Sequence, residues 1–330
     1  MSSAVTSYMI FTVFSQLSVG ALIAMVVADF LAKDKDQAKF FETGAWVSVP
    51  VAVIGLIGIL SHEARPIQAM MTMTKHVGTS MLSNEVLALT VFVILAVIYT
   101  IMWVLHPDYG SLKWFPIFPA IVGKLSMLRK PLGVLSALVG LGFIYVSAAA
   151  YMMYQLPSLN ILTTPMFFYV TALLGGFTAV AAVLSLKYLV KKTNEESLAR
   201  MLWITMVVAL VMLIVLIAAL LMQPGLLGAA ETEYAMAARH ETLDLMQMGE
   251  YATINMARWV IGVGLALILT IVLALPLKKE NMVAAAGIAV VLFIVVLIGE
   301  LMGRAVLFGT NVPMGHVLPN IGAFYSSIGL

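Results

Sequence analysis

The sequence predicts an all-α protein: a polytopic membrane helix bundle of about eight transmembrane helices, with both chain ends on the non-cytoplasmic side. Of the 330 residues, 62% are hydrophobic and only 10% are charged, whereas a typical soluble domain has roughly 25% charged residues. The hydrophobic residues fall in long runs, and about 20 such residues of helix cross about 30 Å of hydrocarbon. The sequence lacks the segments of about ten residues with alternating polarity that are typical of a transmembrane barrel.

Eight apolar runs are interpreted as spans of a single membrane domain, residues 1–330. In chain order they cover residues 8–31, 45–60, 86–105, 131–154, 167–190, 201–222, 259–277 and 282–306. The first run is too long for the core of a signal peptide and follows no lysine or arginine, so we expect it to be retained. The second run is the shortest, and the depth of the residues after it depends on where it ends.

Basic residues predict the orientation, because short loops rich in Lys and Arg stay in the cytoplasm. The loops after the first, third, fifth and seventh runs hold most of the 18 Lys and Arg residues. An even number of crossings then places both ends outside. Asp29, near the inner end of the first run, is expected to be a solvated interfacial charge. The outer segment 224–258 is expected to contain a short surface helix.

Ionisable residues near the membrane gather at the predicted outer side, and such residues are functional hypotheses because charge at membrane depth is costly. His62 follows the second run and Glu85 opens the third. The two helices are antiparallel neighbours, so these side chains can lie at similar depth. Imidazole titrates near neutral pH and burial can bring a carboxyl toward that range, which suits proton acceptance from a quinol. The alternative, two ordinary interfacial residues, stays open on spacing alone.

Glu300 and Arg304 lie near the outer end of the last run. Their spacing predicts an ion pair on one helix face, and a purely structural pair is the simpler interpretation. A haem needs axial ligands, usually histidine on facing helices, and all five histidines lie at helix ends or in loops. Because cysteine is also absent, we predict neither a haem nor a metal site. No basic cluster indicates nucleic acid binding.

Four short elements resemble the membrane-anchor subunit of the dimethyl sulfoxide reductase family, a group of complex iron–sulfur molybdoenzymes. Residues 62–69, His-Glu-Ala-Arg-Pro-Ile-Gln-Ala, resemble its His-Leu-Gly-x-Pro-x-x-Ala, and residues 82–85 resemble its Leu-Ser-x-Glu. Residues 300–304 resemble its Glu-Leu-x-Gly-Arg, and residues 9–16 fit its opening pattern. Residues 63–64, Glu-Ala instead of Leu-Gly, depart from the family pattern and bear on the turn beside the histidine.

The resemblance implies a multi-pass anchor subunit of the bacterial inner membrane, with periplasmic termini, that binds and oxidises menaquinol near the periplasmic face. It implies two partners on that side: a four-cluster iron–sulfur subunit that accepts the electrons, and a catalytic subunit with a molybdenum-bis-pterin cofactor, as in anaerobic respiration. By this resemblance His62 and Glu85 are the residues of quinol oxidation. The expected quinol-binding set comprises His62, Arg65, Glu85, Glu300 and Arg304.

Two alternatives remain at this point. One is a polysulfide-reductase-type quinone anchor, and the other is a transporter or channel without a redox role. Transporters place polar or broken-helix sites near the midplane, and the middle portions of these runs are nearly free of charge, which counts against the second alternative.

Overall fold

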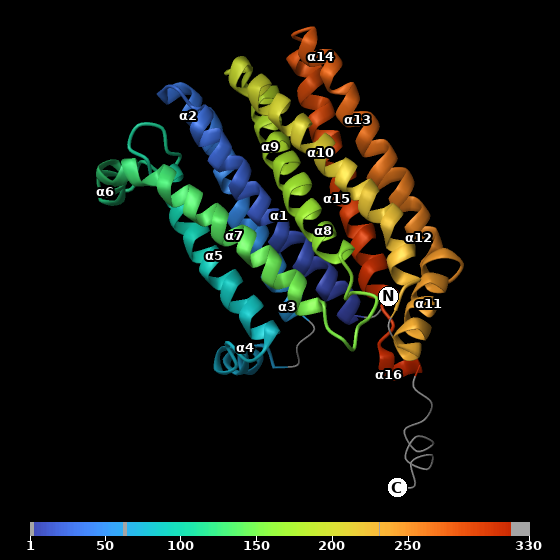
Figure 1. Cartoon of the computed structure of the whole chain (residues 1–330). Helices are drawn as coiled ribbons and strands as arrows, with labels where there is room; N and C mark the ends of the chain where they lie inside the picture. Colours follow the sequence, from blue (N-terminus) through green and yellow to red (C-terminus); the bar gives the residue numbers. More distant parts are fainter. Residues whose placement is uncertain (1–2, 62–64, 231, 318–330) are drawn as a thin grey trace, which may run out of the picture.

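The structure is a computed structural model, and it describes residues 3–61, 65–230 and 232–317. This part of the protein is helical and contains no strand. Eight helical segments in it are long and apolar enough to cross a membrane: Ser3–Leu31, Lys35–Leu60, Met81–Val104, Phe118–Tyr151, Thr163–Lys191, Glu195–Leu227, Ala252–Lys278 and Met282–Gly309. They lie side by side in one bundle (Figure 1). The predicted fold class is therefore confirmed, and the orientation in the membrane stays a prediction.

Four spans are single helices and four are divided. The single ones are α1 (Ser3–Leu31), α5 (Met81–Val104), α10 (Glu195–Leu227) and α15 (Met282–Gly309). The second span comprises α2 (Lys35–Phe41), η1 (Glu42–Trp46) and α3 (Ser48–Leu60), and the fourth comprises α6 (Phe118–Leu125), η2 (Ser126–Leu128) and α7 (Arg129–Tyr151). The fifth span comprises α8 (Thr163–Val170), η3 (Thr171–Gly175) and α9 (Gly176–Lys191). The seventh comprises α12 (Ala252–Ala257), η4 (Arg258–Leu265), α13 (Ala266–Val272) and α14 (Ala274–Lys278). Outside the spans lie α4 (Pro66–Lys75), α11 (Glu233–Gln247) and α16 (Met314–Val317), and α11 is the surface helix expected in segment 224–258.

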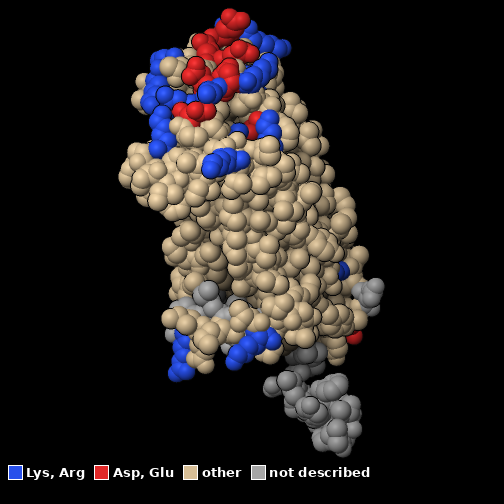
Figure 2. Space-filling model, turned by 90° about the vertical axis from the view of Figure 1, so that its left-hand side faces the viewer, with Lys and Arg blue, Asp and Glu red and all other residues tan. Residues whose placement is uncertain are grey.

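The two ends of the bundle differ in charge. We call the end at which α1 begins and α15 finishes the terminal end, and the other the charged end. In Figure 2 acidic and basic side chains gather at the charged end, at the top, above a broad and nearly uncharged belt. A belt of this kind is what lipid-facing surface requires, because charges in hydrocarbon are costly.

The second span begins at Lys35, well before the predicted start near residue 45. The side chain of Asp34 caps α2 by accepting a hydrogen bond of 2.8 Å from the amide of Gln37, which stabilises a helix start. The charged residues of this turn point outward while Phe40 and Phe41 are buried. These charges interrupt the hydrophobic run in the sequence. They do not interrupt the helix, because one helix face can remain exposed to water while the other is buried.

Helices α1 and α9 approach until their backbones touch. A Cβ atom built on Gly20 would lie 1.6 Å from the carbonyl oxygen of Ala172, and one built on Gly176 would lie 2.1 Å from the carbonyl carbon of Gly20. Small residues permit such contacts and are typical of packed membrane helices. Close packing of backbones therefore accounts for Gly20 and Gly176.

Gly20→Ala is expected to destabilise the protein by about 1–3 kcal/mol, because the added methyl overpacks a backbone contact that cannot shift locally. Thermal unfolding of the detergent-solubilised protein measures the effect. Gly142→Ala in α7 is the matched control, since its methyl would meet no atom within 4 Å. Equal unfolding temperatures for the two variants would contradict this account of the α1–α9 contact.

Asp29 is not a solvated charge, so that expectation was wrong. Its carboxylate is 1% exposed and accepts hydrogen bonds from Arg129 Nε at 2.9 Å and Nη2 at 2.7 Å. Tyr99 donates to the same carboxylate at 3.3 Å, and the Arg129 guanidinium lies 4.0 Å from the centroid of the Trp103 ring. Beside this cluster, burial and then the charge of Arg129 lower the pKa of His106. The partner that neutralises Asp29 comes from a helix 100 residues away.

Candidate functional site

Glu85 lies near the start of α5 at the terminal end of the bundle, and its side chain is fully buried. Ser147, on α7, donates a hydrogen bond of 2.5 Å to Oε1. The other oxygen, Oε2, has no hydrogen-bond partner among the described residues. Leaving a buried polar atom unpaired costs about 1–3 kcal/mol, so this oxygen is available to a proton or to a ligand that donates one.

Two members of the predicted set lie in the connection between α3 and α5. His62 is outside the described residues, and its predicted place beside Glu85 stays a prediction. Just before it, the hydroxyl of Ser61 lies 3.1 Å from that of Ser7 on α1. Arg65 is exposed and donates to Gln68 at 3.4 Å; the structure does not bring it into the buried cluster.

Arg304, on α15, is 2% exposed and lies inside the bundle. Its Nη2 donates to Gln16 Oε1 on α1 at 2.6 Å and to Thr171 Oγ1 at 2.9 Å. Its guanidinium carbon lies 3.9 Å from the centroid of the Phe168 ring, which is a cation–π distance. Nε and Nη1 have no hydrogen-bond partner in the described part of the protein. Arg304 is thus held in place through Nη2, while Nε and Nη1 can still donate hydrogen bonds.

Glu300 and Arg304 share one helix face, as predicted, but they do not form the predicted direct ion pair. The Thr171 hydroxyl lies 2.5 Å from Glu300 Oε2 and also accepts the hydrogen bond from Arg304. Arg258 lies nearby, 5% exposed, and its guanidinium carbon is 4.7 Å from the centroid of the Phe167 ring. These side chains line a cavity of about 10 Å³ together with Phe167, Gly303 and Leu307, which is close to the smallest space that holds one water molecule.

Two helical irregularities position this part of the site. Thr171 begins η3 and Arg258 begins η4, and both are π-helical segments. A π turn accommodates an extra residue and turns the following side chains, and such segments are frequent at functional sites. Each irregularity brings a polar side chain to the Glu300–Arg304 face.

Aromatic rings connect the Glu85 and Arg304 parts of the site. Tyr151, at the end of α7, has its ring centroid 6.2 Å from that of Tyr8, 5.8 Å from that of Phe168 and 5.0 Å from that of Phe308. Its side chain interacts electrostatically with both Glu85 and Arg304. The two charged residues therefore belong to one buried cluster at the terminal end.

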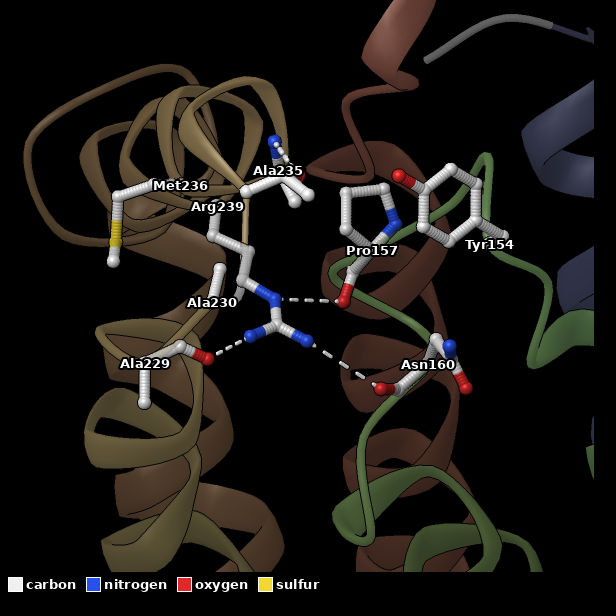
Figure 3. A pocket seen from close by; sticks show the side chains of 9 residues that line it. Tyr154, Pro157, Asn160, Ala229, Ala230, Ala235, Met236 and Arg239 are labelled. Carbon is white, nitrogen blue, oxygen red and sulfur yellow. Dashed lines mark hydrogen bonds between the residues drawn. The ribbon is translucent and has the colours of Figure 1, made fainter.

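A larger pocket, of about 580 Å³, lies at the same end between the 152–162 connection and α11. Arg239 projects into it and donates to the backbone carbonyl oxygens of Pro157 at 2.9 Å, Asn160 at 3.5 Å and Ala229 (Figure 3). Because this cation already joins α11 to the 152–162 connection and to the segment at the end of α10, we interpret the pocket as a structural junction.

A family model described as the DMSO reductase anchor subunit (DmsC) matches residues 3–310 of the sequence. The protein belongs to the DMSO reductase anchor subunit family. It is 25% identical to the YnfH subunit of an anaerobic dimethyl sulfoxide reductase of Escherichia coli, over 94% of this protein and 95% of that relative. It is 28% identical to the C subunit of the anaerobic dimethyl sulfoxide reductase of E. coli, over 93% of this protein and 95% of the relative. The corresponding C subunit from Haemophilus influenzae is 30% identical, over 53% of this protein and 56% of the relative.

Family membership makes this anchor a multi-pass membrane subunit of a molybdoenzyme complex of anaerobic electron transport, and it implies catalytic and iron–sulfur partner subunits. The resemblance inferred from the sequence is confirmed. The family favours the anchor role over the transporter alternative, because its members are anchor subunits of a reductase.

Sequence reasoning missed several residues of the anchor's buried cluster: Gln16, Ser147, Tyr151, Thr171 and Arg258. One signal was present, because Ser147 and Tyr151 are spaced at i and i+4 and lie on one helix face. That face is directed to Glu85. For Thr171 and Arg258 the sequence offered no comparable signal, since the π segments that direct them are not visible in hydropathy.

Proposed function

We propose that this anchor oxidises menaquinol at its terminal end, with that end at the periplasmic face. The quinol loses two protons to groups of the anchor and two electrons to a four-cluster iron–sulfur subunit docked on that side. The electrons continue to the molybdenum-bis-pterin subunit. The observation that carries the proposal is Glu85: a fully buried carboxyl with one oxygen held by Ser147 and the other unpartnered among the described residues.

The chemistry assigns roles to the predicted residues. Glu85 accepts one proton, since a buried carboxyl can be tuned toward the working pH and must lie within hydrogen-bond reach of the hydroxyl. His62 is the candidate acceptor of the second proton, because imidazole titrates near neutral pH. Arg304, with two nitrogen atoms that no described residue engages, is a donor for a quinol oxygen, and Glu300 and Arg258 hold the polar surroundings in place. Arg65 is assigned to the rim of the site.

His62→Ala in the assembled complex tests the proposal. Quinol-dependent reduction of the terminal acceptor is expected to fall about 100-fold or more, as for the loss of a general base. The rate with reduced viologen, a soluble donor that bypasses the anchor, should not change. The control is His240→Ala, because His240 is exposed on α11. Undiminished quinol oxidation in both His62→Ala and Glu85→Gln would exclude this site, and a wild-type complex that oxidises no quinol would exclude the function.

A further inference from the structure

Several buried polar atoms without a partner among the described residues meet at the terminal end of the bundle. They are Glu85 Oε2, the Tyr151 hydroxyl, Arg304 Nε and Nη1, and Gln16 Nε2. Each of these side chains is nine-tenths or more buried. Unpaired buried polar atoms are rare in native proteins and each asks for an explanation.

These atoms belong to one continuous group. Gln16 and Arg304 are hydrogen-bonded at 2.6 Å, and Arg304 lies over the Phe168 ring, which in turn packs against Tyr151. Tyr151 also interacts electrostatically with both Glu85 and Arg304. Other buried atoms without a hydrogen-bond partner in the described ranges belong to Trp103, Arg129, Thr163, Ser185, Arg200, Thr205 and Asn255. Of these, Trp103 and Arg129 lie together beside Asp29, at the charged end of the bundle. One ligand that forms hydrogen bonds with all of these atoms accounts for the group better than a separate explanation for each unpaired atom.

The hydrogen-bonding capacity of the group describes that partner. Glu85 can accept a hydrogen bond, Arg304 and Gln16 can only donate through their free nitrogen atoms, and a phenol hydroxyl can do both. The rings of Tyr8, Phe168 and Phe308 pack against that of Tyr151. The two hydroxyls of a quinol match this order of acceptor and donors, with one hydroxyl toward Glu85 and the other oxygen toward Arg304 and Gln16.

We propose that Tyr151 is a quinol-contacting residue whose hydroxyl bonds the bound head group between Glu85 and Arg304. The proposal rests on the proposed function and extends it to a residue on α7. The head group is thereby held by α5 and α7 at one oxygen and by α1 and α15 at the other. Since the phenol can donate or accept, the contact is kept when the ligand changes from quinol to quinone.

Tyr151→Phe tests the proposal, because it removes the hydroxyl and keeps the ring that packs against Tyr8, Phe168 and Phe308. In the whole complex the KM for a water-soluble menaquinol analogue is expected to rise about tenfold, the effect of one hydrogen bond, with a smaller change in kcat. Binding of a fluorescent hydroxyquinoline N-oxide, a quinol mimic, should weaken by a similar factor. The matched control is Tyr145→Phe on the same helix, because Tyr145 is 64% exposed; it should leave both values unchanged.

The outcomes separate this inference from the proposed function. If the KM and mimic binding of Tyr151→Phe equal those of the wild type while Glu85→Gln abolishes quinol oxidation, the Tyr151 contact is wrong and the function stands. If kcat falls in Tyr151→Phe with KM and mimic binding unchanged, Tyr151 does not bind the head group and the inference also fails. If His62→Ala and Glu85→Gln oxidise quinol normally, the proposed function itself is overturned.

Discussion

Glu85→Gln is expected to slow quinol oxidation by about 10²–10⁴-fold, the usual contribution of a positioned proton acceptor. Glutamine has nearly the same shape, and its side-chain oxygen can still accept the hydrogen bond from Ser147 that the structure shows at 2.5 Å. It cannot take up a proton. The loss should therefore be one of chemistry, with assembly of the complex preserved.

The measurement compares two rates in the same preparation: acceptor reduction driven by menaquinol and acceptor reduction driven by reduced viologen. Only the first should fall in Glu85→Gln. Glu241→Gln is the matched control, because it makes the same change on an exposed residue of α11. A menaquinol rate within about threefold of the wild type would show that Glu85 is not the proton acceptor, since general-base removal costs far more.

Asp29→Asn is expected to cost about 3–5 kcal/mol of folding stability, the usual effect of removing one partner of a buried ion pair. The substitution leaves the Arg129 guanidinium, whose side chain is 11% exposed, without a counter-charge among aromatic rings. Unfolding of the solubilised protein by heat or by sodium dodecyl sulfate measures the loss.

The protein provides its own control for this prediction. Lys35 and Asp108 form an ion pair of 3.0 Å whose side chains are 75% and 44% exposed, so Asp108→Asn should cost much less stability than Asp29→Asn, because solvent screens exposed pairs. The double variant Asp29→Asn with Arg129→Leu should recover much of the stability, because no unpaired charge then remains. Equal losses for Asp29→Asn and Asp108→Asn would mean that the buried pair contributes no more than an exposed one.

The eight spans could be predicted from the amino-acid sequence alone. Crossing a bilayer is a local requirement, since each helix must be apolar over about 20 residues and must satisfy its own backbone hydrogen bonds. Position along a span also placed Glu85, Glu300 and Arg304 at one end of the bundle, because depth follows from residue number in a helix. The predicted start of the second span was wrong because the first helical turn exposes its charged residues to water on one face only. Hydropathy averaged along the sequence does not distinguish the two faces of a helix.

The contacts between side chains, in contrast, emerged only from the packing of the helices. Glu85 finds Ser147 at a separation of 62 residues, and Arg304 finds Gln16 at a separation of 288. Such contacts depend on how each helix is rotated about its axis and how it is tilted against its neighbours. Backbone contacts such as Gly20 against Ala172 and two π segments set this rotation and tilt. Hydropathy determines the depth of a residue but not the direction in which it points. The spacing of Ser147 and Tyr151 shows that they share a helix face, but only the folded bundle shows that this face is directed to Glu85, and only it shows the partner of Asp29.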